Sequence, residues 1–120
     1  PALMQTAIAR GRFMEKIGAA FFEKGELDNL FITGAFSMLH LLLGASLQTA
    51  LDEMHLPSAI YDALISGEGV YAPFLKLAQA LESFDDKPLA GLSKELHITP
   101  EEVNRAHLEA LAFADSLQFS

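Results

Sequence analysis

The most apolar stretch of the chain runs from Leu30 to Leu43 and reads LFITGAFSMLHLLL. No charged residue lies between Asn29 and Asp52. Large apolar side chains cover every face of a helical projection of this stretch, and a helix of that kind is buried in a protein core or in a membrane. The pattern predicts a central helix that Gly44 ends. The side chains expected in its core are Phe31, Phe36, Leu39 and Leu43.

A membrane span is the alternative interpretation of this stretch. A spanning helix needs about 20 mostly apolar residues. The stretch reaches that length only by extension to Leu51, which includes the polar residues Thr33, Ser37, His40, Ser46, Gln48 and Thr49. No basic cluster flanks it to set an orientation. We therefore expect a buried helix, in which the small residues Gly34 and Ser37 let a neighbouring helix or a ligand approach closely.

Amphipathic patterns predict further helices on both sides of the central one. In residues 2–24 the apolar positions approximate a 3.6-residue stripe, and most charged residues lie off it. Further helices are expected at residues 47–54, 58–66, 70–83, 89–97 and from 100 to the end, with turns at 67–69 and 84–88. The links are short and no strand pattern is present. The sequence therefore predicts one compact all-α domain over residues 1–120, with about seven helices.

Several residues are suited to begin or end these helices. Gly25 is a plausible C-cap for the first helix, and Asp28 is a plausible N-cap for the central one. Ser46 can cap the helix at 47–54. The clearest start signal is Thr99-Pro100-Glu101-Glu102, in which Thr99 and Glu102 have the spacing of a capping box.

Composition narrows the classes of function. The chain of 120 residues is 51% hydrophobic and 20% charged, which excludes a disordered protein. It has no cysteine and therefore no disulfide, thiolate nucleophile or iron–sulfur cluster. No segment resembles a secretion signal, so we expect a cytoplasmic protein. The chain begins with Pro1 and not with Met, and we expect it to be a piece of a longer chain.

The acidity of the chain argues against nucleic acid as a partner. The formal net charge is −8 at pH 7, whereas phosphate binding needs clustered Lys and Arg. The segment ITPEEVNRA at residues 98–106 has the pattern of part of a helix-turn-helix. Its reading helix would hold Glu101, Glu102 and Glu109 against Arg105, which is the wrong charge for a major groove. The same charge disfavours anionic membrane surfaces.

The histidines are the candidates for metal chemistry. His40 lies inside the apolar stretch, and Asp52 and His55 have the i, i+3 spacing that places two side chains on one helix face. Together they could form a metal site, with Asp28 or His107 as a further ligand. The simpler interpretation is a packed His40 with one hydrogen bond, and a solvated helix end at Asp52 and His55.

Several motifs together resemble a known family. The run Leu30–Leu39 resembles the helix that carries the His-Asp metal dyad in proteins of the HD superfamily. It is most similar to the HDOD output domains, relatives of the HD-GYP phosphodiesterases, in the variant found C-terminal to EAL domains. The supporting segments are residues 10–15 (RGRFME), 31–44, 56–57, 63–64, 67–69, 74–81 and 112–115. The resemblance implies an HD-like orthogonal bundle, of which this chain is the C-terminal part.

The chain departs from the enzymes at the dyad itself. Where an HD enzyme carries His-Asp, this sequence has Ser37-Met38, and neither a hydroxyl nor a thioether is a suitable ligand for a hard metal. Without those ligands no binuclear centre can activate water. We therefore assign no catalytic, cofactor or metal residues, and we expect no cofactor. The alternative is a metal-dependent HD-type phosphohydrolase with a rearranged site that uses His40, Asp52 and His55.

The resemblance suggests a function without catalysis. It implies an output or interaction module of bacterial signal transduction, regulatory in cyclic-di-GMP signalling. The expected partner is a neighbouring EAL domain of the same protein or another signalling protein, with no nucleic acid and no membrane. Because family domains are longer, missing N-terminal helices would leave an apolar surface uncovered. We expect the chain to form a homodimer through that surface.

Overall fold

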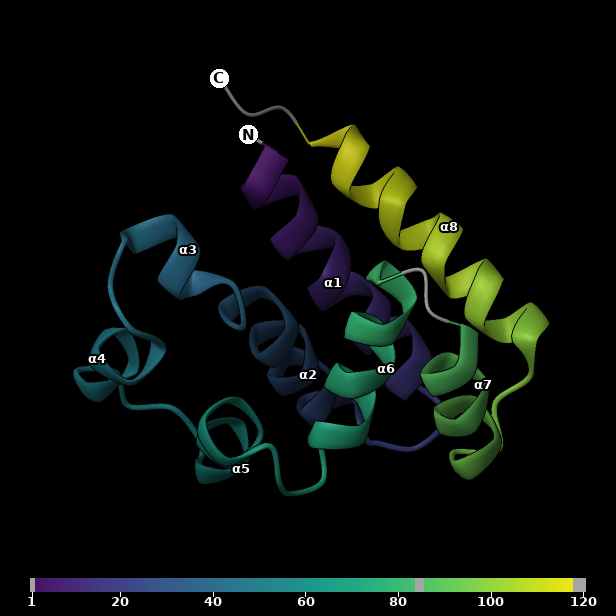
Figure 1. Cartoon of the computed structure of the whole chain (residues 1–120), viewed down its shortest axis with the longest axis horizontal. Helices are drawn as coiled ribbons and strands as arrows, with labels where there is room; N and C mark the ends of the chain where they lie inside the picture. Colours follow the sequence, from purple (N-terminus) through teal and green to yellow (C-terminus); the bar gives the residue numbers. More distant parts are fainter. Residues whose placement is uncertain (1, 84–85, 118–120) are drawn as a thin grey trace.

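Helices make up the architecture of the chain, as the sequence predicts (Figure 1). The computed structural model describes residues 2–83 and 86–117, and this part contains no strand. In chain order the elements are α1 (Ala2–Gly18), α2 (Lys24–Phe36), α3 (Leu39–Leu43), α4 (Leu47–Asp52), α5 (Ser58–Tyr61), the π-helix η1 (Asp62–Ser66), α6 (Ala72–Glu82), α7 (Asp86–Glu95) and α8 (Pro100–Ser116). The described part has eight α-helices where the sequence predicts about seven, mainly because the predicted central helix is divided in two.

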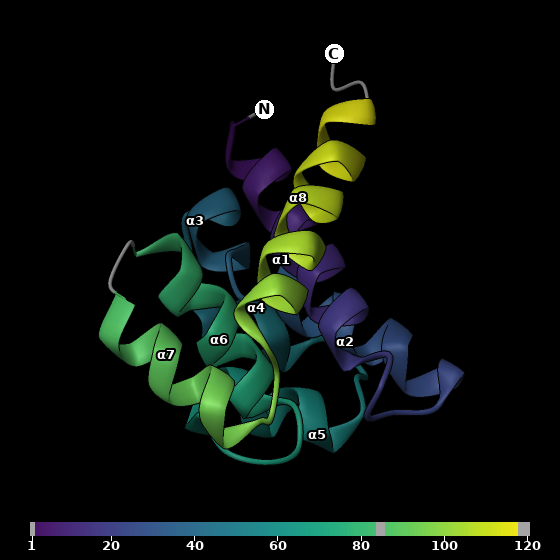
Figure 2. The ribbon, with the colours of Figure 1, turned by 90° about the vertical axis from the view of Figure 1, so that its right-hand side faces the viewer.

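Helix α1 is the element on which the others pack. It lies between α2 and α8, and α6 also contacts it; α8 runs alongside it in the opposite direction (Figures 1 and 2). The large core side chains from these four helices include Phe13, Met14, Ile17, Leu30, Phe74, Leu77 and Val103. Prediction of the 30–43 stretch as the centre of the domain is therefore wrong. The amphipathic first helix holds that position, since it has partners on several sides.

The link between α1 and α2 differs from the prediction. Helix α1 ends at Gly18 and not at residue 24, and α2 already begins at Lys24. Gly25 and Asp28 therefore lie inside α2, and neither caps a helix; the N-cap residue is Glu23. Tertiary packing explains why the first helix ends early. The ring of Phe22 leaves the helical path to pack edge-on against Tyr71 and Phe74, with ring centroids 5.4 and 5.3 Å away.

The predicted central helix breaks at Ser37 and Met38. The hydroxyl of Ser37 donates to the Gly34 carbonyl oxygen over 2.6 Å, and the amide of Met38 then donates to the Ala35 carbonyl. A serine side chain that takes a backbone acceptor in this way competes with helix continuation. The five residues of α3 follow in a new direction and end, as predicted, at Gly44 in a left-handed conformation (φ 69°).

This break overturns part of the predicted core. The side chains of Phe31, Phe36 and Leu39 are only half-buried. Leu43 is exposed, and α3 has no buried residue. In a continuous helix, Leu43 would lie on the same face as Leu39 and would contact the same neighbouring residues. Once the chain turns after Phe36, the last three leucines of α3, Leu41 to Leu43, are exposed.

The middle of the chain follows the predicted helices with local changes. Ser46 caps α4 as predicted, since its hydroxyl accepts from the Thr49 amide, but α4 ends at Asp52 and not at residue 54. The helix predicted over 58–66 begins as α5 and continues as the π-helix η1. Ile60 is buried, whereas Ile65 is exposed. The wider π-helical turn changes the direction of the side chains that follow Asp62.

The C-terminal third is the part that the sequence predicts best. Pro73 lies in the first turn of α6, and Thr99 and Glu102 form the predicted capping box at the start of α8. Helix α7 begins at Asp86, so residues 86–88 of the predicted turn are helical; residues 84 and 85 lie outside the described part. Among the helices described, none has both the length and the apolar character that a membrane crossing requires.

Candidate functional site

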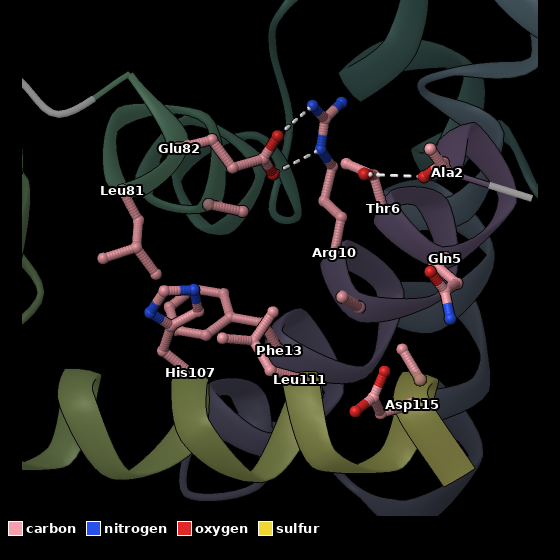
Figure 3. Close-up of a pocket in the computed structure, with 13 residues that line it drawn as sticks. Ala2, Gln5, Thr6, Arg10, Phe13, Leu81, Glu82, His107, Leu111 and Asp115 are labelled. Carbon is pink, nitrogen blue, oxygen red and sulfur yellow. Dashed lines mark hydrogen bonds and ion pairs between the residues drawn. The ribbon is translucent and has the colours of Figure 1, made fainter. Parts of the chain in front are cut away.

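An arginine that is only slightly exposed joins three elements of the fold. From α1, the Nε and Nη2 groups of Arg10 donate to the two carboxylate oxygens of Glu82 on α6, over 2.8 and 2.6 Å (Figure 3). Its Nη1 group donates to the hydroxyl of Ser37 over 2.7 Å. The Arg10 side chain is 12% exposed. A bidentate pair of this kind has a fixed geometry. Arg10 therefore ties α1 to the end of α6 and to the junction between α2 and α3.

The small residues next to this network bring the helix backbones together. A Cβ atom on Gly34 would lie 2.7 Å from the Cα of Gly11 on α1, which confirms the close approach predicted at Gly34. Ser37 is buried with both functions of its hydroxyl in use, since it accepts from Arg10 and donates to the Gly34 carbonyl. Its neighbour Met38 is buried as well. The side chains of Ser37 and Met38 therefore fill the space at this position and leave almost no opening to solvent.

A cavity of about 490 Å³ opens next to the Arg10–Glu82 pair, between α1, α6 and α8 (Figure 3). Most of its walls are apolar, and its apolar side chains include Ala9, Phe13, Ala78, Leu81, Leu111 and Ala114. The polar side chains lie around the edge. In Figure 3 the Arg10–Glu82 pair lies on one side of the cavity and Asp115 on the other, beside Gln5. This volume lies within the range of small-molecule sites, about 300–1,000 Å³.

The charges around the cavity are not balanced. Glu82 matches the charge of Arg10. Asp115 is exposed and makes no ion pair or hydrogen bond with the residues that the structure describes. His107 also lines the cavity, and its ring stands edge-on to Phe13 with centroids 6.5 Å apart. Among the lining residues, Asp115 is therefore the one formal charge at neutral pH that has no opposite charge beside it.

The arrangement suits binding better than group transfer. The proton of the Ser37 hydroxyl is donated to a carbonyl, and the group that donates to this hydroxyl is a guanidinium, which is not a base. His107 and Asp115 lie on one helix eight positions apart, about 12 Å along its axis, so they cannot form a hydrogen-bonded catalytic pair. What the cavity offers is an apolar space with a carboxylate at its edge.

The residues of the alternative metal site are placed separately. His40 lies half-buried on α3, where its Nδ1 atom is buried without a hydrogen-bond partner among the described residues. Asp52 is exposed at the end of α4 and accepts a hydrogen bond from the side-chain Nε2 group of Gln48 over 2.8 Å, and His55 is exposed in the following loop. Across residues 2–83 and 86–117, no group of three or more His, Asp or Glu side chains could hold a metal ion. His40, Asp52 and His55 are thus not assembled into a site.

Only part of the network is visible in the sequence. The sequence predicts close approach at Ser37, and Arg10 lies in the RGRFME motif that supports the family resemblance. No local signal in the sequence marks Glu82, which is 72 positions from Arg10. No local signal marks the cavity either, since three helices that are separate in the sequence form it. The sequence shows only that Ala78 and Ala114 are small residues, which leave little side-chain volume on their helix faces.

Similarity to known proteins does not narrow the function of this site. The resemblance to the HDOD domains therefore stays a prediction from the motifs, and what the site does has to be inferred from its own residues. Comparison of the chain with protein-family models, with curated proteins and with solved structures found no match.

Proposed function

We propose that this chain is a non-catalytic interaction module of bacterial signal transduction, with the HD-like bundle of an HDOD domain. In this proposal it regulates cyclic-di-GMP signalling by packing against a neighbouring EAL domain or another signalling protein. The observation that carries the proposal is the Ser37–Met38 junction, which has two effects. Its two residues are buried where, by the resemblance, the enzymes carry the catalytic dyad, and the chain that follows exposes an apolar surface on α3.

The first effect concerns catalysis. In the family that the sequence resembles, the enzymes hold metal with His-Asp at this position. Here Ser37 and Met38 are 8% and 5% exposed, and the Ser37 hydroxyl is bonded on both sides. The position therefore connects helices, and its atoms face the protein interior. This supports a structural use of the segment that carries the metal in the enzymes.

The second effect concerns interaction. The side chains of Leu41, Leu42 and Leu43 are 54%, 39% and 60% exposed, and we refer to them as the α3 leucine face. They lie in the stretch between Asn29 and Asp52, which has no charged residue. Copies of a chain with a net charge of −8 repel one another over most of their surface. A second copy, or an acidic neighbouring domain, meets the least electrostatic repulsion at an uncharged leucine surface.

Metal analysis tests the non-catalytic half of the proposal. We expect tag-free protein purified without chelator to contain well below one equivalent of zinc, manganese, iron or nickel by elemental analysis. The reason is that the dyad position offers a hydroxyl and a thioether, which bind such metals weakly. A stoichiometric metal would overturn the proposal in favour of the rearranged hydrolase. Loss of that metal in His40→Ala would then identify the ligand.

Charge introduced on the α3 leucine face tests the interaction half. We expect the wild-type chain to dimerise, and Leu43→Glu to raise the dissociation constant at least about tenfold, because a symmetric interface would have to bury two unpaired carboxylates. The measurement is sedimentation velocity over a concentration series. The thermal midpoint of the monomer should not change, since Leu43 lies outside the core.

Leu108→Glu is the matched control. Leu108 is 67% exposed on α8, so this variant adds the same charge at an equally exposed leucine of another face. We expect its dimer to keep the wild-type dissociation constant. A wild-type chain that stays monomeric at high concentration would contradict the homodimer. Dissociation by Leu108→Glu alone would place the interface on α8.

A further inference from the structure

We propose that the cavity between α1, α6 and α8 is a binding site for a small hydrophobic amine. The apolar body of the ligand would lie among the side chains of the three helices, and its ammonium group would pair with Asp115. This site is distinct from the α3 leucine face, and nothing in the proposed function requires it.

The walls of the cavity determine the body of the ligand. Ala78 and Ala114 are buried and present only methyl groups, so the three helices meet without filling the space between them. Phe13, Leu81 and Leu111 add larger apolar surfaces. An apolar group that enters such a space leaves water without losing hydrogen bonds. A space of about 490 Å³ has room for a phenyl ring with a short alkyl chain.

The charges determine the head group. The guanidinium of Arg10 has its charge matched by Glu82 and is also bonded to Ser37. It is therefore poorly placed to bind an anion, and a carboxylate ligand would face both Glu82 and Asp115. Asp115 is exposed at the opposite edge of the cavity and has no cation beside it in the described part of the chain (Figure 3). A cationic head group is the one that this edge favours.

The charge of the whole chain acts in the same direction. A formal net charge of −8 creates a negative potential that attracts cations and repels anions at long range. The carboxylate of Asp115 and the negative potential of the whole chain therefore both favour a positively charged ligand. A neutral ligand would use the apolar walls alone and would leave Asp115 without a partner.

Three probes with the same body test the proposal. They are 4-phenylbutylamine, 4-phenylbutan-1-ol and 4-phenylbutanoate, each titrated into the full ¹⁵N-labelled chain while amide shifts are followed by NMR. We expect the amine to shift amides of α1 and α8 around Ala9 and Ala114, with a dissociation constant on the order of 0.1–1 mM. The alcohol should bind more weakly and the carboxylate most weakly.

Two single-charge variants locate the head group. Asp115→Asn should weaken binding of the amine about threefold to fivefold, as expected for one partly exposed ion pair, and should leave binding of the alcohol unchanged. Glu53→Gln removes the same charge at an exposed residue after α4, away from the cavity lining, and should leave the affinity for the amine at its wild-type value.

A third variant tests the cavity itself. Ala9→Leu places a larger side chain at a lining position that is only half-buried, and should abolish the amine-induced shifts while the rest of the spectrum stays folded. Equal affinity for the three probes, or tightest binding of the carboxylate, would overturn the amine as the ligand class. Absence of cavity shifts with every probe would overturn the site.

Discussion

Gly34→Ala is expected to lower the free energy of unfolding by about 2–3 kcal/mol. The added Cβ atom would lie 2.7 Å from the Cα and 2.8 Å from the amide nitrogen of Gly11. Both are backbone atoms of α1, so no side-chain rotation can relieve the contact, and the two helices have to separate. Separation loosens the packing of α2 on α1, which extends over much of both helices. Urea unfolding followed by circular dichroism measures the effect.

Gly91→Ala is the control for this substitution. Gly91 lies inside α7, and a Cβ atom there would meet no heavy atom within 4 Å. Alanine is the better helix former, so this variant should be more stable than the wild type by about 0.5–1 kcal/mol. If Gly34→Ala were as stable as Gly91→Ala, the close crossing of α1 and α2 would be wrong.

Removal of the carboxylate at position 82 is expected to have a comparable effect. Glu82→Met should destabilise the fold by about 2–3 kcal/mol, because it leaves the largely desolvated guanidinium of Arg10, whose side chain is 12% exposed, without its charge partner. Glu82 is itself 32% exposed, which keeps the expected loss below that of a fully buried pair. A double-mutant cycle with Arg10→Met isolates the interaction, and we expect a coupling energy of about 1–3 kcal/mol.

The ion pair between Lys16 and Glu109 provides the matched cycle. Its nitrogen–oxygen distance is 3.2 Å, but its side chains are 37% and 46% exposed. Exposed pairs contribute little, so its coupling energy should be below about 0.5 kcal/mol. Equal coupling energies in the two cycles would show that Arg10 does not hold α1, α6 and the α2–α3 junction together.

Features that depend on neighbours in the sequence could be predicted. The all-helical class follows from apolar periodicity and the lack of strand patterns. The caps at Ser46 and Thr99 follow from side chains that bond amides three residues later, and both are present. The fit of Pro73 in the first turn of α6 is also local, since a residue there needs no amide hydrogen for the helix. Each of these interactions is complete within one helical turn, so no knowledge of the tertiary structure is needed.

Features that depend on distant segments could not be predicted. The helix break at Ser37 involves Arg10, which is 27 positions earlier, and the Arg10–Glu82 pair spans 72 positions. Hydropathy alone favoured one helix from Leu30 to Leu43, because it does not register a polar bond between helices. The cavity is harder still, since it depends on how closely α1, α6 and α8 approach one another.

The side chain of Arg10 connects the cavity with the turn into α3. It lines the cavity, and its Nη1 group holds Ser37 at the start of the turn into α3. A molecule in the cavity that moves this guanidinium would change the bond that orients α3. Thermodynamic coupling between two sites is reciprocal. Partner binding at the α3 leucine face would then change the affinity of the cavity for its ligand by the same factor by which the ligand changes the affinity for the partner. The Arg10 side chain would couple the two binding sites.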